Sequence, residues 1–144
     1  MLLISHRGNI DGPDPETENS VKQILEALEI GLQVEIDVRY SSGKWYLGHD
    51  YAQYQVDPHF LKYNSNRLWC HAKNIDALTG MLEMGIHCFW HQEDNYTLTS
   101  KRIVWAYPNY YCKGAILVMP SKEFLDTLTE PIYGICVDDP VNYL

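Results

Sequence analysis

The sequence lacks several features that would place it in whole classes of protein. Its 144 residues contain no apolar run approaching the roughly 20 residues of a transmembrane helix. Basic residues are too few to balance the acidic ones, and the formal net charge of −8 argues against binding along a nucleic-acid backbone. No internal repeat, low-complexity tract or long linker divides the chain, so we expect a single domain over residues 1–144.

Cysteine motifs and a signal peptide are also missing. None of the four cysteines forms a CxxC pair, and Cys70, Cys88 and Cys136 lie in strand-like apolar runs. Such positions are typical of small buried side chains in a reducing compartment, although an even count leaves disulfides open. The opening residues, MLLISHRG, have no basic region and no small-residue cleavage site, so we interpret them as a strand. We therefore expect a cytoplasmic protein.

What the chain does contain is an alternation of strands with short helices or loops. Helical apolar spacing and capping residues predict helices over 20–31, 74–85 and 123–128. Apolar runs bounded by turn residues predict strands over 2–5, 34–40, 44–48, 67–72, 86–91, 103–107, 115–119 and 134–137. Strands separated by helix-length connections favour an α/β fold with a largely parallel sheet.

Two carboxylates share one face of the strand predicted over 34–40. Glu35 and Asp37 stand two residues apart, so their side chains point the same way. Burying such a pair is costly unless a cation compensates, and Mg²⁺ or Ca²⁺ is the natural choice for oxygen ligands. The alternative is that Val34, Ile36 and Val38 form the only buried face and the carboxylates lie in water.

Two histidines and an arginine stand at predicted strand ends. His6 and Arg7 end the first strand, and His49 follows the strand over 44–48. Histidine exchanges protons near neutral pH, and arginine binds phosphate oxygens through two nitrogens. Taken singly, each residue is more typical of a surface turn or loop. Together with the carboxylate pair, they match the acid–base groups and cations that phosphodiester cleavage requires.

Four linked motifs resemble the glycerophosphodiester phosphodiesterase family, within the superfamily of phospholipase C-like phosphodiesterases. They are His6-Arg7-Gly8, Glu18-Asn19-Ser20, Glu35-Ile36-Asp37-Val38 and Gly48-His49-Asp50, in the family's order over roughly the first 50 residues. The run from Gly134 to Pro140 resembles the family's closing strand. The resemblance implies a small TIM-type (β/α) barrel, and because an ordinary one needs about 250 residues, several connecting helices must be shortened or missing.

The resemblance also implies a role for each matching residue. It makes His6 and His49 the acid–base pair and Arg7 a phosphate ligand. Glu18 and Asn19 would support the first loop. The implied activity is metal-dependent hydrolysis of a small glycerophosphodiester-like substrate.

The expected metal ligands depart from the family pattern at one position. Glu35 and Asp37 match the family's ligands, and Lys73 matches its phosphate-binding lysine. His71 stands where the third acidic ligand belongs, and histidine favours softer ions than Mg²⁺ or Ca²⁺. We expect Mg²⁺ or Ca²⁺, with Mn²⁺ or Zn²⁺ as alternatives. An acidic residue at 93 or 94 could supply the missing charge.

Other interpretations stay open at this point. A catalytically inactive relative that binds a phosphate-bearing ligand or partner is the main alternative, and a nuclease is disfavoured by the charge. His87 and His91 do not suggest a zinc site, because four residues along a strand span about 13 Å. His91 and Trp105, at strand ends, could line the pocket, and Trp105 would also suit a sugar. We expect apolar flanks left by missing helices to be covered in a homodimer.

Overall fold

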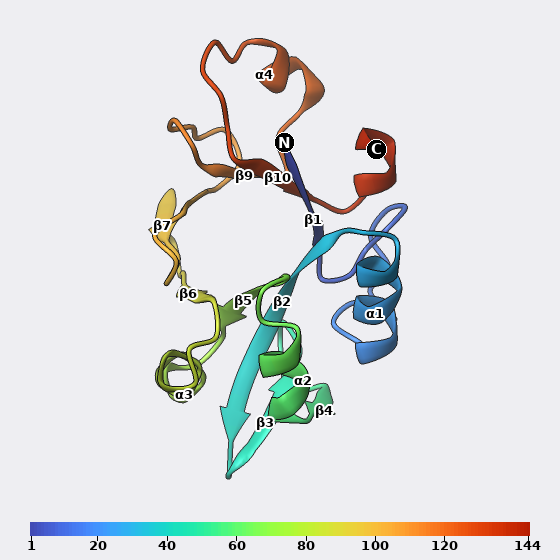
Figure 1. The fold of residues 1–144 in the computed structure, drawn as a ribbon, viewed down its shortest axis with the longest axis vertical. Coiled ribbons are helices and arrows are strands. Elements are labelled where there is room, and N and C mark those ends of the chain that lie inside the picture. The colour runs from blue at the N-terminus through green and yellow to red at the C-terminus, as the bar shows by residue number, and fades with distance from the viewer.

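Ten strands form one curved, mixed sheet, and four short helices lie on its outside (Figure 1). This computed structural model describes residues 1–144. The strands are β1 Leu2–His6, β2 Gln33–Ser41, β3 Lys44–Leu47, β4 Tyr54–Val56, β5 Leu68–Ala72, β6 Cys88–Trp90, β7 Tyr96–Leu98, β8 Val104–Ala106, β9 Ile116–Val118 and β10 Gly134–Val137. The helices are α1 Val21–Glu29, α2 Pro58–Tyr63, α3 Ile75–Glu83 and α4 Lys122–Asp126, with a final 3₁₀ turn at Pro140–Tyr143.

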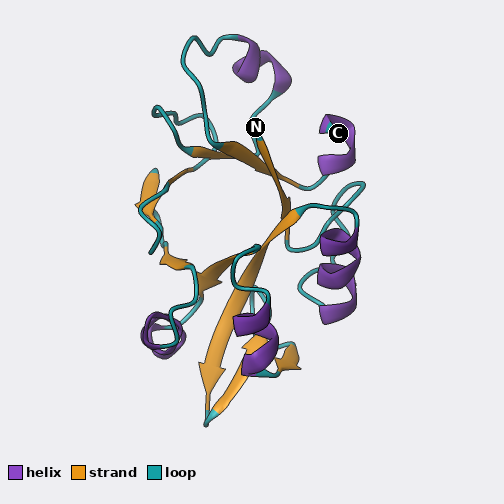
Figure 2. Ribbon diagram, in the orientation of Figure 1, coloured by secondary structure: helices purple, strands orange, loops and turns teal.

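Seven of the strands run parallel in the spatial order β6-β5-β2-β1-β10-β9-β8. β3 pairs antiparallel with the end of β2 and carries β4, while β7 pairs antiparallel with β8. No strand pairing joins β6 to β7, so the sheet curls into an open half-barrel and does not close. Figure 2 shows the helices in purple outside this orange curl.

The expectation of a trimmed TIM-type (β/α) barrel is therefore wrong. Two connections between the later parallel strands contain no helix. Between β6 and β8 the chain forms the strand β7, and between β8 and β9 residues 107–115 form a loop. A crossover with a helix takes a dozen or more residues, and this link is shorter than that. The largely parallel character of the sheet and the antiparallel return of β3 after β2 were predicted. The openness of the sheet and the antiparallel strands β4 and β7 were not.

Local signals placed the longer elements correctly. The Ser20 side chain accepts a hydrogen bond from Gln23 N and begins α1, and Asn74 does the same for Ala77 N at α3. The three-residue strands β4 and β7 and the helix α2 were not predicted, because three residues show no reliable alternation. At α2 the sequence does carry a signal, since Asp57 caps the helix and Pro58 occupies its first turn.

Alternation along the parallel strands separates an outer surface from an inner one. Outward side chains such as Val34, Ile36 and Cys70 pack in the larger core, which includes residues of α1, α2 and α3. The inward side chains of six strands meet in an apolar cluster, Ile4, Trp69, Phe89, Trp105, Ile116 and Cys136. The next inward positions toward the carboxyl ends of the strands are mostly polar, namely His6, His71, His91, Tyr107 and Asp138. On the inner surface of the sheet, a layer of polar side chains therefore lies next to the apolar cluster, toward the carboxyl ends of the strands.

No helix of the structure is long and apolar enough to cross a membrane. The four cysteines are free thiols, and Cys70, Cys88 and Cys136 are buried as expected.

Candidate functional site

The polar layer lines a pocket of about 260 Å³ at the carboxyl ends of the parallel strands. Seven of the nine residues predicted for the site line it: His6, Arg7, Glu35, Asp37, His49, His71 and Lys73. They lie between residues 6 and 73, and the later part of the chain closes the pocket with His91, Gln92, Trp105, Tyr107 and Val118. Parallel pairing explains the convergence, because the strands end at one rim of the sheet.

The other two predicted residues, Glu18 and Asn19, support the pocket from behind. Asn19 donates from Nδ2 to Asp37 Oδ2 at 2.9 Å and accepts from Asp37 N at 2.9 Å. Its backbone has a φ of 63°, a left-handed conformation that asparagine adopts more readily than most residues. Glu18 accepts hydrogen bonds from Arg7 Nη1 at 3.1 Å and from Asn9 Nδ2 at 3.0 Å. Both residues therefore fix the loop that follows β1.

Three potential metal ligands meet on neighbouring strands. Ligand atoms of Glu35, Asp37 and His71 all lie within 4.8 Å of one another. His71 Nδ1 lies 3.5 Å from Asp37 Oδ1 and 3.9 Å from Glu35 Oε1. The register of the sheet brings them together, since Asp37 on β2 stands directly beside His71 on β5.

The two carboxylates are buried without enough positive charge to balance them. Glu35 is 3% exposed and Asp37 1%, and Glu35 Oε2 has no hydrogen-bond partner. Burial, and then the charge of Asp37, raise the pKa of Glu35 well above its ordinary value. An orphaned buried carboxylate oxygen beside a second carboxylate and an imidazole fits a divalent cation, which would relieve both costs.

His71 is held on one face of its ring and at the edge of the ring. The ring stacks on Phe89, with centroids 5.0 Å apart and planes 16° from parallel. Its Nε2 lies 3.4 Å from the backbone carbonyl oxygen of His91. Burial is the main cause that lowers the pKa of His71, and it outweighs the nearby Asp37 charge. The imidazole is therefore neutral near pH 7.

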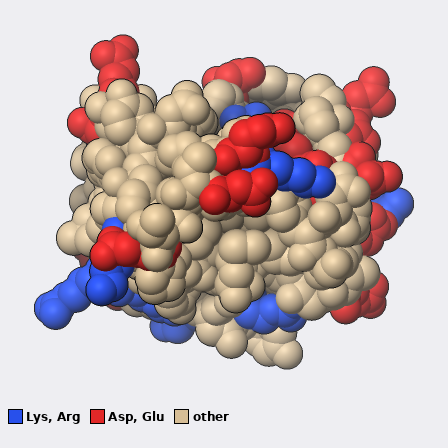
Figure 3. All heavy atoms as spheres, turned by 90° about the horizontal axis from the view of Figure 1, so that it is seen from above, with Lys and Arg blue, Asp and Glu red and all other residues tan.

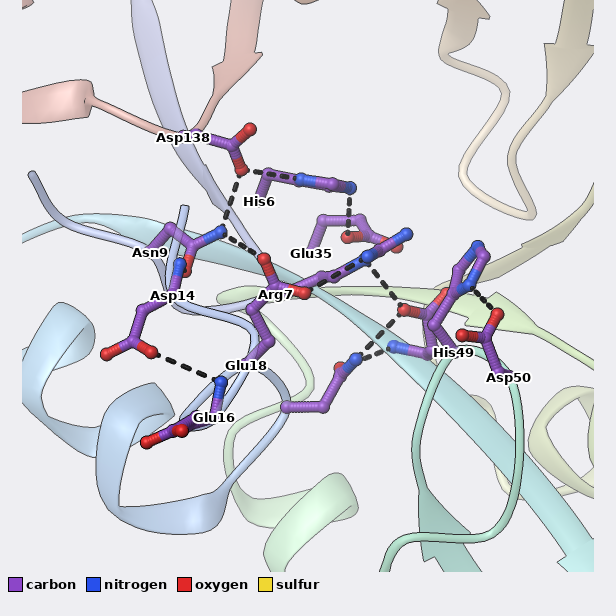
Figure 4. A network of polar contacts seen from close by, with 12 residues as sticks. His6, Arg7, Asn9, Asp14, Glu16, Glu18, Glu35, His49, Asp50 and Asp138 are labelled. Carbon is purple, nitrogen blue, oxygen red and sulfur yellow. Dashed lines mark hydrogen bonds and ion pairs between the residues drawn. The ribbon is translucent and has the colours of Figure 1, made fainter. Parts of the chain in front are cut away.

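His6 is oriented by a residue far away in the sequence (Figure 4). Its Nδ1 lies 2.7 Å from Asp138 Oδ1, which also accepts from Asn9 Nδ2 at 2.8 Å. Its Nε2 is 3.8 Å from Glu35 Oε2 and faces the carboxylates. Burial by itself would lower the pKa of His6, but the bond to Asp138 and the charge of Glu35 outweigh it and raise the pKa.

Asp138 was missed as a site residue. Burial alone would raise its pKa, but the hydrogen bonds from His6 and Asn9 outweigh burial and lower it, so this carboxylate is ionised. The only sequence signal was its place in the run from Gly134 to Pro140, directly after the strand that pairs with β1. That run resembles a known closing strand but does not by itself reveal a partner for His6.

Arg7 is anchored by two acidic side chains. Its Nη1 pairs with Glu18, and its Nε lies 3.2 Å from Asp37 Oδ2 without the alignment of a hydrogen bond. Burial would lower the Arg7 pKa, but the carboxylates of Asp37, Glu35 and Glu18 together outweigh it and raise the pKa. Arg7 and Gly8 both have left-handed backbones, and a Cβ on Gly8 would press on the backbone of Gln23 and Ile24 at 3.3 Å. The turn therefore requires glycine there.

His49 and Lys73 line the outer part of the pocket. The His49 side chain is 43% exposed and its Nδ1 lies 2.7 Å from Asp50 Oδ1 (Figure 4). Lys73 follows β5 and forms no ion pair with a carboxylate. Both side chains are thus available to a ligand that enters from solvent.

The opposite wall is aromatic and holds two polar atoms without partners. His91 stacks on Tyr107 with ring centroids 3.5 Å apart. His91 Nδ1 and Tyr107 Oη are both buried and make no hydrogen bond. Burial is the main cause that raises the Tyr107 pKa, so this phenol is neutral and can donate a hydrogen bond. His91 and Trp105 line the pocket as the sequence suggested, whereas Tyr107 was not predicted.

Two further sequence-based ideas are not part of this pocket. The acidic residues Glu93 and Asp94 are exposed and do not line it, so neither replaces the missing third acid. His87 is buried against Trp69, with ring centroids 4.4 Å apart, and belongs to no potential metal cluster.

Comparison of the chain with models of known protein families, with curated proteins and with solved structures gives no match. The resemblance to the phosphodiesterases therefore rests on the sequence motifs alone.

Proposed function

We propose that this chain is a divalent-metal-dependent phosphodiester hydrolase acting on a small, glycerophosphodiester-like substrate. One observation carries the proposal: a histidine oriented by a carboxylate faces a buried, under-compensated carboxylate pair in one pocket. His6 Nδ1 is bound by Asp138, and Glu35 lies within 3.8 Å of its Nε2. This combination provides a proton-transfer group next to a site for a cation.

The position of each residue in the pocket suggests its role in the proposed reaction. Asp138 accepts the Nδ1–H of His6 and leaves Nε2 free to take a proton from the attacking hydroxyl or water. Arg7 and Lys73 contribute positive charge for the phosphate oxygens, and the unpaired hydroxyl of Tyr107 offers one more donor. A divalent ion held by Glu35, Asp37 and His71 would act as a Lewis acid on a phosphoryl oxygen.

His49 is the second proton-transfer group in this proposal. It lines the same pocket as His6 but is far more exposed, at 43% against 21% of the side chain. A leaving alcohol must depart toward solvent, so the exposed histidine is suited to protonate it. His6, which is buried beside the carboxylates, is suited to activate the nucleophile.

The surface and the pocket size favour a small substrate. The net charge is −8, and Figure 3 shows acidic side chains spread over one face, with separate basic side chains and no continuous basic patch. Binding along a nucleic-acid backbone requires such a patch. The pocket volume of about 260 Å³ suits a small phosphodiester. The homodimer expected from the sequence stays a prediction.

A phosphate-binding protein without activity is the second candidate, and one observation favours it. Arg7 is already engaged by Glu18 and Asp37, which reduces the charge it can offer to a reacting phosphate. A binding protein would nonetheless have no use for the His6–Asp138 pair. Turnover decides between the two candidates.

The test is hydrolysis of bis-p-nitrophenyl phosphate and glycerophosphocholine with Mg²⁺, Ca²⁺, Mn²⁺ or Zn²⁺. We expect His6→Ala to lower kcat with both substrates by about 10²- to 10⁴-fold. His49→Ala should lower kcat much less with bis-p-nitrophenyl phosphate than with glycerophosphocholine, because nitrophenolate leaves without needing a proton. His59→Ala, on the exposed face of α2, is the matched control and should change nothing. Folded protein with no metal-dependent turnover of either substrate would refute the enzyme and leave the binding protein.

A further inference from the structure

We infer that His71 makes this site selective for a first-row transition ion, such as Mn²⁺ or Zn²⁺, over Mg²⁺ and Ca²⁺. The inference rests on the metal site of the proposed function and concerns which ion that site takes. It is carried by the way the His71 ring is held, which the sequence does not reveal.

The surroundings of the ring decide which nitrogen carries the proton. The atom that faces His71 Nε2 is the carbonyl oxygen of His91, at 3.4 Å, and a carbonyl can only accept a hydrogen bond. Nε2 therefore carries the proton in the neutral ring. The lone pair of Nδ1 then points toward Asp37 Oδ1 at 3.5 Å and Glu35 Oε1 at 3.9 Å. A proton donor to a backbone carbonyl on one side and a free lone pair on the other is the usual arrangement of a metal-binding histidine.

The ring has little freedom to withdraw from that position. Phe89 stacks on it with planes 16° from parallel, and the His71 side chain is 12% exposed. Its backbone is fixed between Asp37 and Phe89 by the parallel register of β5. A cation that enters the carboxylate pair therefore meets an imidazole nitrogen.

The oxygen donors of the cluster are also few. Asp37 Oδ2 already accepts a hydrogen bond from Asn19 and lies beside Arg7, which leaves Oδ1 for an ion. Glu35 supplies the only other carboxylate of the cluster. Ca²⁺ takes six to eight oxygen ligands and Mg²⁺ prefers oxygen in a strict octahedron. Mn²⁺ and Zn²⁺ accept a mixed set of carboxylate oxygen and imidazole nitrogen.

The experiment compares metal binding by wild-type protein and His71→Glu after removal of ions with a chelator. Titration calorimetry with MnCl₂ and MgCl₂ gives the ratio of the two affinities for each protein. Because most sites bind Mn²⁺ more tightly than Mg²⁺, the change in that ratio is what matters. We expect His71→Glu to lower the ratio by about 10- to 100-fold. His59→Glu, an exposed histidine on α2, is the control and should leave the ratio unchanged.

A second measurement needs no variant. Mn²⁺ bound to wild-type protein should show ¹⁴N coupling in its electron spin-echo modulation, as direct imidazole ligation requires. Absence of that coupling, or an unchanged affinity ratio in folded His71→Glu, would overturn the inference. Neither readout depends on turnover. Metal selectivity without hydrolysis would contradict the proposed function alone, and Mg²⁺-supported hydrolysis without nitrogen ligation would contradict this inference alone.

Discussion

Replacing Glu35 by glutamine should stabilise the metal-free protein, although it removes a proposed metal ligand. Glu35 and Asp37 are 3% and 1% exposed, and Glu35 Oε2 has no partner. Glutamine keeps the shape of the side chain and removes its charge. The prediction follows from the idea that this pair is built for a cation and is strained without one.

The size of the effect follows from the geometry of the pair. Their ligand atoms lie within 4.8 Å, and two unit charges at that separation repel by about 3.5 kcal/mol at an effective dielectric constant of about 20. Attraction of Glu35 to His6 and Arg7 offsets part of this. We therefore expect Glu35→Gln to raise the free energy of unfolding at pH 9, where Glu35 is ionised, by about 1–3 kcal/mol, or the Tm by about 3–12 °C for a domain of this size.

The gain should grow with pH. Burial and the Asp37 charge raise the pKa of Glu35 in the folded protein above its ordinary value of 4.5. A raised carboxyl pKa contributes stability that is fully present below the unfolded value and is lost as pH rises through the folded value. Wild-type protein should thus lose stability relative to Glu35→Gln from about pH 4.5 upward.

The assay is thermal unfolding of chelator-treated protein at pH 5 and pH 9, without and with Mn²⁺. Wild type should gain stability from the ion, by about 4.1 kcal/mol at a thousandfold excess over Kd, while Glu35→Gln should gain little. The order of the two proteins should therefore reverse when metal is added. Glu83→Gln, an exposed carboxylate without an ion pair, is the control. A metal-free Glu35→Gln that is less stable than wild type at pH 9 would refute the reasoning.

Two further predictions concern other buried groups. Asp138→Asn removes the charge that orients His6. In steady-state assays kcat/KM should therefore fall by about 10²- to 10⁴-fold, while the affinity for Mn²⁺ stays within a few-fold of wild type. An unchanged kcat/KM would show that Asp138 does not position His6. His87 is 3% exposed, and burial, then Lys101, lower its pKa from 6.5 to about 4. A lowered histidine pKa gives stability that is present above pH 6.5 and lost as pH falls toward 4, by about 3 kcal/mol. In urea unfolding followed by tryptophan fluorescence, His87→Leu should lose less stability than wild type over this range, and a pH-independent difference would contradict the assignment.

Much of the local structure could be predicted from the sequence, because it depends on residues close together in the chain. The side chains of Ser20 and Asn74 begin their helices by accepting hydrogen bonds from backbone N–H groups three residues ahead. The alternation in β2 placed Glu35 and Asp37 on one face. The order of the motifs also predicted which residues would gather in the pocket. The capping and alternation patterns are short-range and need no knowledge of the rest of the fold, whereas the prediction from the motifs came from their resemblance to a known family.

The closure of the sheet could not be predicted in the same way. Whether β6 and β7 pair depends on strand twist and on the lengths of several connections together, and the barrel expectation was wrong for that reason.

The sequence by itself determined the chemical types in the pocket, and only the tertiary structure decided how they act on one another. His6 meets Asp138 across 132 positions because β1 pairs with β10. His71 meets Asp37 because β5 pairs in parallel register with β2. A shift of that register by one residue would turn the side chain of His71 to the outer face. Strand pairing, which the sequence does not display, therefore sets both the orientation of His6 and the ring nitrogen of His71 that faces the carboxylates.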